Sequence, residues 1–395
     1  MLLVLVPLVI LVSSCIHSPT DAGTSPALVW KTPLAPRGVS EYQMHVISYN
    51  REIIVVVGVD STGQQVLLGV DANTGKERWR WKEYFSTFEL DTWIPFVWEN
   101  YLVFGSGGRR YCVDMATGRT VWRMRDSYTN GSEFVRLFEP WQYSFIADIG
   151  GDTAVGKFAC FMSDVLQPTP ELLYQSDSMV GLCLPAAYVN QNGEKVLLFV
   201  EHDWKTRKDS GQLTSNSYLF CYRLSDNTTV YRVPYARTKN RGLVDNRPGV
   251  IYNNKYYKDA GQRIVCYDPD TGRLIWYQDF PGDFLFSGFI IVDGTIYANC
   301  EDTYLYALDA ETGLIKWREK SSGTSSPLFY MDGVLYYVGG GDGMLHAVDA
   351  ATGKHLWKID PPERNDYGFT PSRPTGFDGR LYVTSWTTAY CYRVR

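Results

Sequence analysis

The sequence predicts an all-β fold, an eight-bladed β-propeller of four-stranded sheets, on three observations. One nine-residue pattern recurs along the chain at a nearly constant spacing. Alternating apolar segments surround each copy of this pattern, with turn-forming residues between them. A segment near the N-terminus also matches the strand that the last repeat lacks. Strand-rich repeats of about 40 residues are typical of propeller blades.

The recurring pattern is Asp-x-x-Thr-Gly-x-x-x-Trp. It occurs at residues 71–79, 114–122, 268–276, 309–317 and 349–357. Adjacent copies lie 43, 41 and 40 residues apart (114−71, 309−268 and 349−309). An Asp side chain can accept backbone N–H groups in a tight turn, and Gly supplies the positive φ that the turn needs. We interpret each copy as a hairpin turn rather than a calcium loop, with the Trp filling the space between neighbouring blades.

Two further turns in each repeat bring the number of strands to four. Asp-Gly pairs at 293–294, 332–333 and 378–379 lie between apolar runs, which is a strong hairpin signal. Seven complete units are expected, with closing strands near Trp79, Trp122, Tyr174, Tyr231, Trp276, Trp317 and Trp357. The eighth unit, residues 371–394, lacks a closing strand. Residues 27–34 are expected to supply it and so close the ring; seven blades are the alternative.

Cysteines recur at one position of the repeat, two residues before the motif Asp or its equivalent. These are Cys112, Cys221, Cys266 and Cys391. Other repeats have Gly69, Ala307 and Ala347 at the same position. A position that accepts only Gly, Ala or Cys is cramped and buried, and cysteines on corresponding strands of different blades are too far apart for disulfides. We therefore expect free, buried thiols.

The N-terminal sequence predicts an export signal. Residues 2–12 form an apolar run of signal-peptide length, followed by Val-Ser-Ser-Cys, which resembles a bacterial lipobox ending at Cys15. We expect a lipoprotein signal peptide at residues 1–14, a lipidated Cys15, a flexible tether at 15–26 and a single propeller domain at 27–395. A buried N-terminal strand with an ordinary cysteine is the alternative.

Charge and motifs exclude several classes of function. The net charge of −5 argues against a nucleic-acid partner. The chain has no adjacent Cys-Cys pair, no Cys-x-x-Cys-His and no Gly-x-Ser-x-Gly. Its histidines show no metal-ligand spacing; they are His17, His45, His202, His346 and His355. We expect no catalytic residue, no metal and no cofactor, and thus a protein that is not an enzyme.

Two predicted loops carry excess positive charge in this acidic chain. They are an insertion at residues 201–217 and an inter-blade loop at 236–248, expected on the same face of adjacent blades. We predict that a protein partner binds there, through Trp204, Lys205, Arg207, Lys208, Arg237, Lys239 and Arg241. The alternative is solvated loop charge without a partner.

The repeats resemble those of the PQQ-like β-propellers over residues 27–394, and the length, lipobox and blade number resemble the BamB family within that group. The resemblance implies an outer-membrane lipoprotein that faces the periplasm. It further implies a monomer within a complex, docking a component of outer-membrane β-barrel assembly and touching the membrane only through its lipid. Two alternatives remain: an envelope propeller that binds another protein or a glycan, and a relative of the quinoprotein dehydrogenases, which use pyrroloquinoline quinone.

Overall fold

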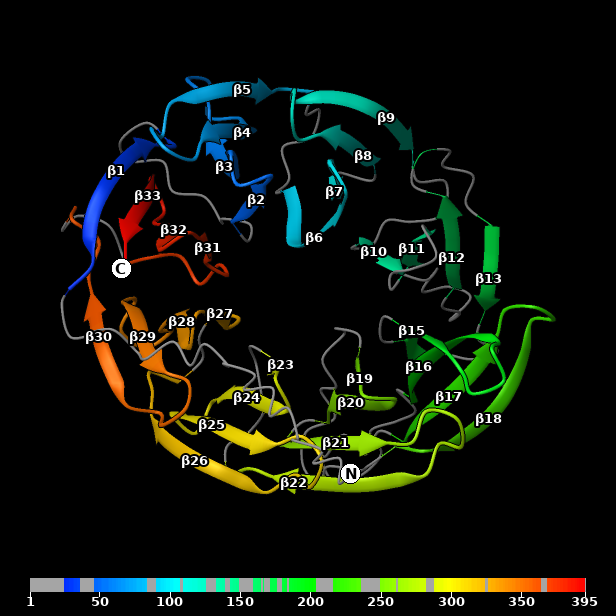
Figure 1. Cartoon of the computed structure of the whole chain (residues 1–395). Helices are drawn as coiled ribbons and strands as arrows, with labels where there is room; N and C mark the ends of the chain where they lie inside the picture. The colour runs from blue at the N-terminus through cyan, green and yellow to red at the C-terminus, as the bar shows by residue number, and fades with distance from the viewer. Residues whose placement is uncertain are drawn as a thin grey trace, which may run out of the picture.

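The computed structural model is built from strands arranged in a ring (Figure 1). It describes residues 25–35, 46–83, 90–106, 109–125, 133–138, 143–148, 159–164, 166, 171–175, 180–182, 185–203, 216–235, 249–260, 262–281, 288–323, 326–363 and 368–394. The strands in these ranges form eight antiparallel sheets, numbered here in chain order.

The first four sheets come from residues 47–234. Sheet 1 contains β2 (Ile47–Tyr49), β3 (Ile53–Val59), β4 (Gln65–Asp71) and β5 (Glu77–Trp81). Sheet 2 contains β6 (Leu90–Trp98), β7 (Tyr101–Ser106), β8 (Arg109–Asp114) and β9 (Arg119–Arg125). Sheet 3 contains β10 (Glu133–Phe138), β11 (Tyr143–Asp148), β12 (Ala159–Asp164) and β13 (Glu171–Gln175). Sheet 4 contains β14 (Val180–Leu182), β15 (Ala186–Val189), β16 (Lys195–Asp203), β17 (Asn216–Arg223) and β18 (Thr228–Pro234).

The remaining sheets complete the ring. Sheet 5 contains β19 (Val250–Tyr252), β20 (Lys255–Asp259), β21 (Arg263–Tyr267) and β22 (Leu274–Asp279). Sheet 6 contains β23 (Phe289–Val292), β24 (Thr295–Cys300), β25 (Tyr304–Asp309) and β26 (Ile315–Lys320). Sheet 7 contains β27 (Phe329–Met331), β28 (Val334–Val338), β29 (Leu345–Asp349) and β30 (His355–Ile359). Sheet 8 contains β31 (Thr375–Phe377), β32 (Arg380–Thr384), β33 (Thr388–Arg393) and, from the N-terminus, β1 (Ala27–Pro33).

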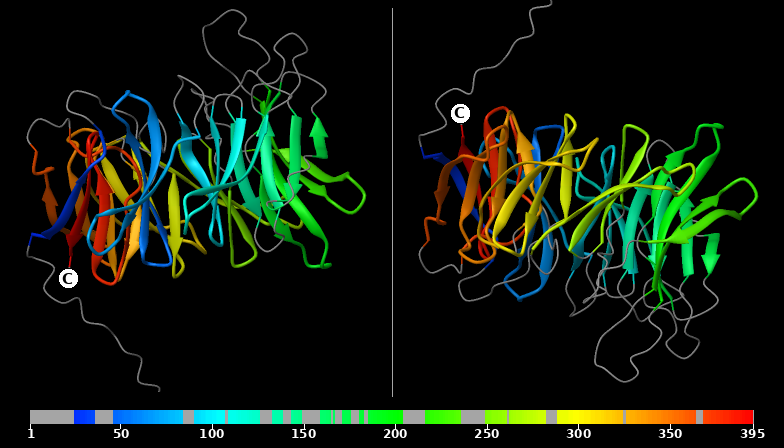
Figure 2. Two further views of the ribbon diagram at one scale, coloured as in Figure 1. Left: turned by 90° about the horizontal axis from the view of Figure 1, so that it is seen from above. Right: turned by 90° about the horizontal axis from the view of Figure 1, so that it is seen from below.

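The chain ends meet in sheet 8. Strand β1 pairs antiparallel with β33, from Ala27 opposite Arg393 to Pro33 opposite Thr388. This is the pairing that the N-terminal match to a closing strand predicts. Figure 1 shows β1 on the outside of this sheet, and Figure 2 shows the sheets standing side by side around the ring. The all-β propeller fold expected from the sequence is therefore confirmed.

The hydrophobic core lies between neighbouring sheets. One cluster joins Val55 and Val57 of sheet 1 to Leu102 and Phe104 of sheet 2. Equivalent clusters join sheets 4 and 5, 5 and 6, 6 and 7, 7 and 8, and 8 and 1. Sheets 1, 5, 6, 7 and 8 thus bury both faces against their neighbours, as sheet-on-sheet packing requires.

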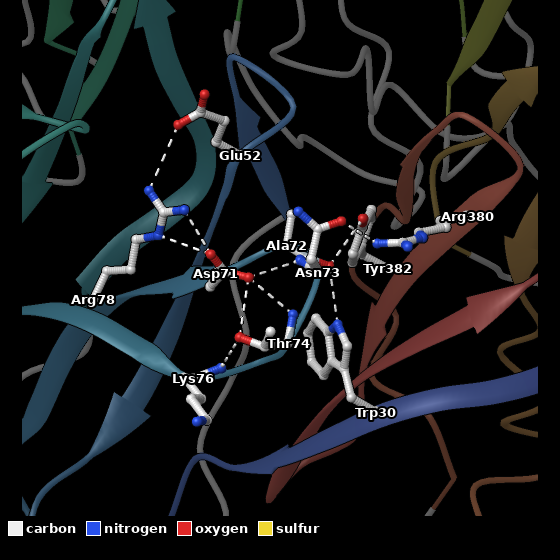
Figure 3. Close-up of polar contacts among 10 residues, drawn as sticks. All are labelled: Trp30, Glu52, Asp71, Ala72, Asn73, Thr74, Lys76, Arg78, Arg380 and Tyr382. Carbon is white, nitrogen blue, oxygen red and sulfur yellow. Dashed lines mark hydrogen bonds and ion pairs between the residues drawn. The ribbon is translucent and has the colours of Figure 1, made fainter.

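The Asp-x-x-Thr-Gly motif forms the turn that the sequence predicts (Figure 3). Asp71 Oδ1 accepts the backbone N–H groups of Asn73 and Thr74, at 3.0 and 2.9 Å, and the Thr74 hydroxyl at 3.0 Å. Asp309 repeats all three bonds with Glu311 and Thr312. The carboxylate oxygens are therefore used within the turn, which confirms the structural interpretation of these aspartates.

Three of the motif tryptophans fasten their sheet to the next one. Trp79 of sheet 1 donates its indole N–H to the Met115 carbonyl of sheet 2, at 2.9 Å. Trp276 and Trp317 do the same to Ala310 and Ala350 in the following sheets. The ring also covers the turn glycine: a Cβ on Gly313, whose φ is +74°, would lie 2.6 Å from the Trp276 ring. The glycine therefore provides both a positive φ and room for the neighbouring indole.

The small residue before each motif lies beneath the aromatic ring of its own sheet. Cys112, Cys221 and Cys266 pair across the strands with Trp122, Tyr231 and Trp276, and Cys391 pairs with Trp30. All four cysteines are free and buried, and Cys300 is as well. The prediction of buried free thiols is confirmed. Cys160 pairs with Tyr174 in sheet 3 and so occupies the same position.

Candidate partner-binding surface

The residues predicted to bind a partner lie outside the part of the chain that the structure describes, and so does the predicted lipidation site, Cys15. The seven partner-binding residues are Trp204, Lys205, Arg207, Lys208, Arg237, Lys239 and Arg241. Their placement therefore stays a prediction. The predicted insertion (201–217) and inter-blade loop (236–248) are together called the two basic segments. The strands that flank them are described, and the ends of these strands form the base of the candidate surface.

The two basic segments leave the described strands at adjacent points. The insertion leaves sheet 4 where Asp203 of β16 faces Asn216 of β17. The inter-blade segment leaves after Tyr235, whose backbone N–H donates to the carbonyl of Ser217 at 2.8 Å. One hydrogen bond thus joins the base of the insertion to the base of the inter-blade segment.

The insertion is shorter than the sequence suggests. Residues 201–203 belong to β16 and residues 216 and 217 belong to β17. The prediction that Glu201 belongs to the insertion is therefore wrong. Its side chain is 7% exposed, because β16 extends further than its polar residues indicate.

Glu201 is the centre of a polar cluster that the sequence did not predict. Its Oε1 accepts the hydroxyl of Tyr174 from sheet 3 at 2.6 Å, and its Oε2 accepts Arg232 Nε at 2.9 Å. The Arg232 guanidinium carbon lies 3.5 Å from the centroid of the Tyr218 ring. The Glu201 charge is therefore neutralised within the base. Alternation along β16, with Glu201 and Phe199 on the same side, is the signal that could have revealed it.

Tyr235 connects this base to the next sheet. Its hydroxyl donates to the Asp259 carbonyl at 2.6 Å, and its ring stacks on Tyr267 with centroids 5.9 Å apart. The Asp259 carboxylate in turn accepts Lys258 Nζ at 2.8 Å, and the Lys258 side chain is fully buried. A buried ion pair is costly to break from one side, so it holds this part of sheet 5 in one arrangement.

The described cysteines are poor nucleophiles. Burial raises the pKa of Cys112, Cys221 and Cys266 to about 12, so these thiols stay protonated at neutral pH. Within the described ranges, no group of three or more His, Cys, Asp or Glu side chains is arranged to hold a metal ion. The same ranges contain no helix long and apolar enough to cross a membrane.

The chain is similar in sequence to known proteins over part of its length. The family model of outer membrane protein assembly factor BamB matches residues 228–368, which cover sheets 5 to 7. Outer membrane protein assembly factor BamB of Shewanella oneidensis is 24% identical over 143 residues, 35% of this chain and 34% of that protein. The dehydrogenase subunit of a quinone-dependent alcohol dehydrogenase from Gluconacetobacter polyoxogenes is 30% identical over 130 residues, 29% of this chain and 17% of that protein.

Similarity in structure extends over most of the chain. The crystal structure of BamB from Moraxella catarrhalis superposes with a TM-score of 0.60 and 12% identity, covering 93% of this chain and all of that one. The sequence matches, by contrast, span about a third or less of the curated relatives. Together, the repeated turn, the ring of four- and five-stranded sheets and these matches identify the chain as a β-propeller of PQQ-like repeats that resembles BamB.

Proposed function

We propose that this chain is a non-catalytic scaffold, anchored to the outer membrane by a lipid on Cys15, that docks a component of β-barrel assembly in the periplasm. The family-model match over sheets 5 to 7 carries this proposal. The protein would act as a monomer within a complex, without a cofactor, and would touch the membrane through its lipid alone.

We further propose that each sheet is one blade of an eight-bladed propeller closed by β1. The pairing of β1 with β33 supports closure, because it gives sheet 8 the outer strand that its own repeat lacks. A closed ring leaves no end at which the core between sheets 8 and 1 is open to water. Such a ring would provide a rigid support for binding loops.

The shared base of the two basic segments supports docking at sheets 4 and 5. The Tyr235–Ser217 hydrogen bond joins the described strand ends from which both segments leave, and Arg232 neutralises Glu201 close to these ends. The charge of the segments themselves is then dominated by their lysines and arginines. An acidic protein surface is the partner that fits, with charge setting the rate and specificity of encounter.

Affinity capture from gently solubilised membranes tests this function. Tagged wild-type protein should recover a barrel-assembly component, and a variant with Lys205, Arg207 and Lys208 all changed to Ser should recover several-fold less. A second triple variant, with Arg119, Arg273 and Lys354 all changed to Ser in exposed motif turns, is the charge-matched control. Mass spectrometry of the purified protein tests the lipid on Cys15 separately.

Equal capture by wild type and the triple variant, with unchanged melting temperature, would remove the basic segments from the proposal. Recovery of other envelope proteins or of glycans in place of the assembly component would favour the second binding hypothesis.

The similarity to a quinone-dependent alcohol dehydrogenase subunit keeps one enzymatic alternative open. A quinoprotein would take up pyrroloquinoline quinone tightly in the presence of a divalent cation and reduce dyes with an alcohol substrate. We expect neither. Stoichiometric quinone uptake with dye-linked activity would replace the scaffold proposal.

A further inference from the structure

Two histidines that lie nine residues apart in the sequence meet at the outer part of sheet 7. His346 is on β29 and His355 begins β30, where it pairs with Val348. The Nδ1 atom of His346 lies 3.3 Å from the Nε2 atom of His355, and the rings are perpendicular with centroids 5.4 Å apart. The His346 side chain is 5% exposed, whereas His355 is exposed to solvent.

The surroundings of His346 decide which nitrogen carries its proton. Both carboxylate oxygens of Asp342 lie 3.0–3.1 Å from Nε2, and the Ser322 hydroxyl lies 3.3 Å from the same atom. A carboxylate only accepts, so Nε2 carries the proton and Nδ1 presents its lone pair toward His355. The Tyr337 ring stacks on the imidazole, with centroids 4.8 Å apart and planes 8° apart, and holds its orientation.

This arrangement matches half of a zinc coordination sphere. Two nitrogens bound to one tetrahedral Zn²⁺ at 2.0–2.1 Å lie about 3.3 Å from each other. Metal-bound histidines commonly donate their other ring N–H to a carboxylate, which is the role Asp342 has here. We propose that His346 Nδ1 and His355 Nε2 form a two-histidine site for a zinc-class divalent cation, with Asp342 as the positioning residue.

The site would be open and of moderate affinity. Within the described residues there is no third His, Cys, Asp or Glu arranged to join the pair, so water would complete the coordination. Lys358 Nζ, 3.6 Å from Asp342 Oδ2, adds a nearby positive charge that opposes the cation. This proposal is independent of the proposed function.

Calorimetric titration of the untagged full chain with ZnCl₂ at pH 7.5 tests the site. We expect saturable binding of one Zn²⁺ with a Kd below about 1 mM. His355→Gln, at an exposed position, should weaken binding by about tenfold or more. Lys358→Gln should strengthen it several-fold, because it removes the opposing charge. Lys354→Gln, in the neighbouring turn, is the control and should leave the affinity unchanged.

Two further measurements separate coordination from a merely structural role. Cu²⁺ bound at one equivalent should show electron paramagnetic resonance couplings from two imidazole nitrogens, and His355→Gln should show fewer. Asp342→Asn should weaken Zn²⁺ binding several-fold at unchanged fold, because the Nε2–H group of His346 loses its carboxylate acceptor, and Asp342→Glu should restore part of the affinity. Equal Zn²⁺ affinity in Asp342→Asn and the wild type would remove Asp342 from the site.

A hydrogen bond between the two imidazoles without metal binding predicts a different result. If the rings merely share a hydrogen bond, Zn²⁺ up to 1 mM will give no saturable heat, or His355→Gln will bind it as the wild type does. Either outcome overturns the proposal.

Discussion

The indole Nε1 of Trp30 donates a hydrogen bond of 2.9 Å to the carbonyl of Ala72, 42 residues further along the chain. Trp30 lies on β1, in sheet 8, and Ala72 lies in the first motif turn, in sheet 1. The Tyr382 hydroxyl of β32 reaches the same carbonyl at 3.2 Å (Figure 3). The N-terminal strand therefore joins the last sheet to the first by the contact that motif tryptophans make elsewhere in the ring.

Trp30→Ala should be strongly destabilising. It removes a buried indole from the core between sheets 8 and 1, and such losses typically cost about 3–5 kcal/mol. Trp30→Phe keeps most of the apolar contact and should cost about 1 kcal/mol, the value of the lost hydrogen bond. Urea unfolding followed by fluorescence measures both. Leu28→Ala, at a 43% exposed position on the same strand, is the control and should stay within about 0.5 kcal/mol of wild type. Equal effects at Leu28 and Trp30 would contradict this role.

Gly69→Ala should destabilise sheet 1 although alanine is native at the same position of sheets 6 and 7. A Cβ on Gly69 would lie 2.1 Å from the Trp79 ring, which is rigid and cannot move aside cheaply. We expect a loss of about 1–3 kcal/mol, as for other overpacked cores. Trp79→Tyr in the same molecule should restore part of it, so the two changes will be non-additive in denaturant unfolding. Strict additivity would show that the clash is not the cause.

Asp309→Asn should reduce stability in a pH-dependent way. Hydrogen bonds from the Thr312 side chain and backbone hold the pKa of Asp309 below its usual 3.8. Because the folded pKa is depressed, the ionised carboxylate stabilises the fold above pH 3.8, and this contribution is lost as pH falls through the folded pKa. The difference in melting temperature between wild type and variant should therefore be constant near neutral pH and shrink below pH 3.8. A constant difference down to pH 2 would argue against a charged turn.

The described thiols should be unreactive until the protein unfolds. Burial raises the pKa of Cys266 to about 12, and its ring partner Trp276 covers it. Ellman's reagent at pH 8 should modify none of Cys112, Cys221, Cys266, Cys300 or Cys391 in the native protein and all five in guanidinium. Cys266→Ala should change stability by less than about 1.5 kcal/mol, since alanine fills the same position at Ala307 and Ala347. Rapid native modification of Cys266, located by peptide mapping, would show that the site opens.

Much of the fold could be predicted because its turns are made by local interactions. Asp71, Thr74 and Gly75 form their turn with each other, so their spacing alone reveals it. The Gly, Ala or Cys position is equally visible, because in sheets 1, 2 and 4 to 7 the Trp or Tyr that covers it comes ten residues later. The pairing of β1 with β33 could be predicted for a similar reason: residues 27–30 repeat the sequence of a closing strand.

The candidate site could be predicted only in part. The positive charge of residues 201–217 and 236–248 is a property of composition, but the length of β16 is not. Glu201 is polar and therefore predicts a loop position. It is nevertheless buried, because Tyr174 of sheet 3 and Arg232 of β18 donate hydrogen bonds to its two carboxylate oxygens. Neither partner is near it in sequence, so no local pattern contains this information.

The sequence by itself determined the repeat, the four strands of every sheet except sheet 4, which has five, and the small residues beneath the rings. Each of these features depends on neighbours within one turn or hairpin. Only the tertiary structure decided that Tyr235 joins the bases of the two basic segments, and that His346 and His355 face each other beside Asp342. These contacts depend on strand register and on packing between sheets. Both are set by the burial of whole faces against neighbouring sheets, which no single segment of the chain encodes.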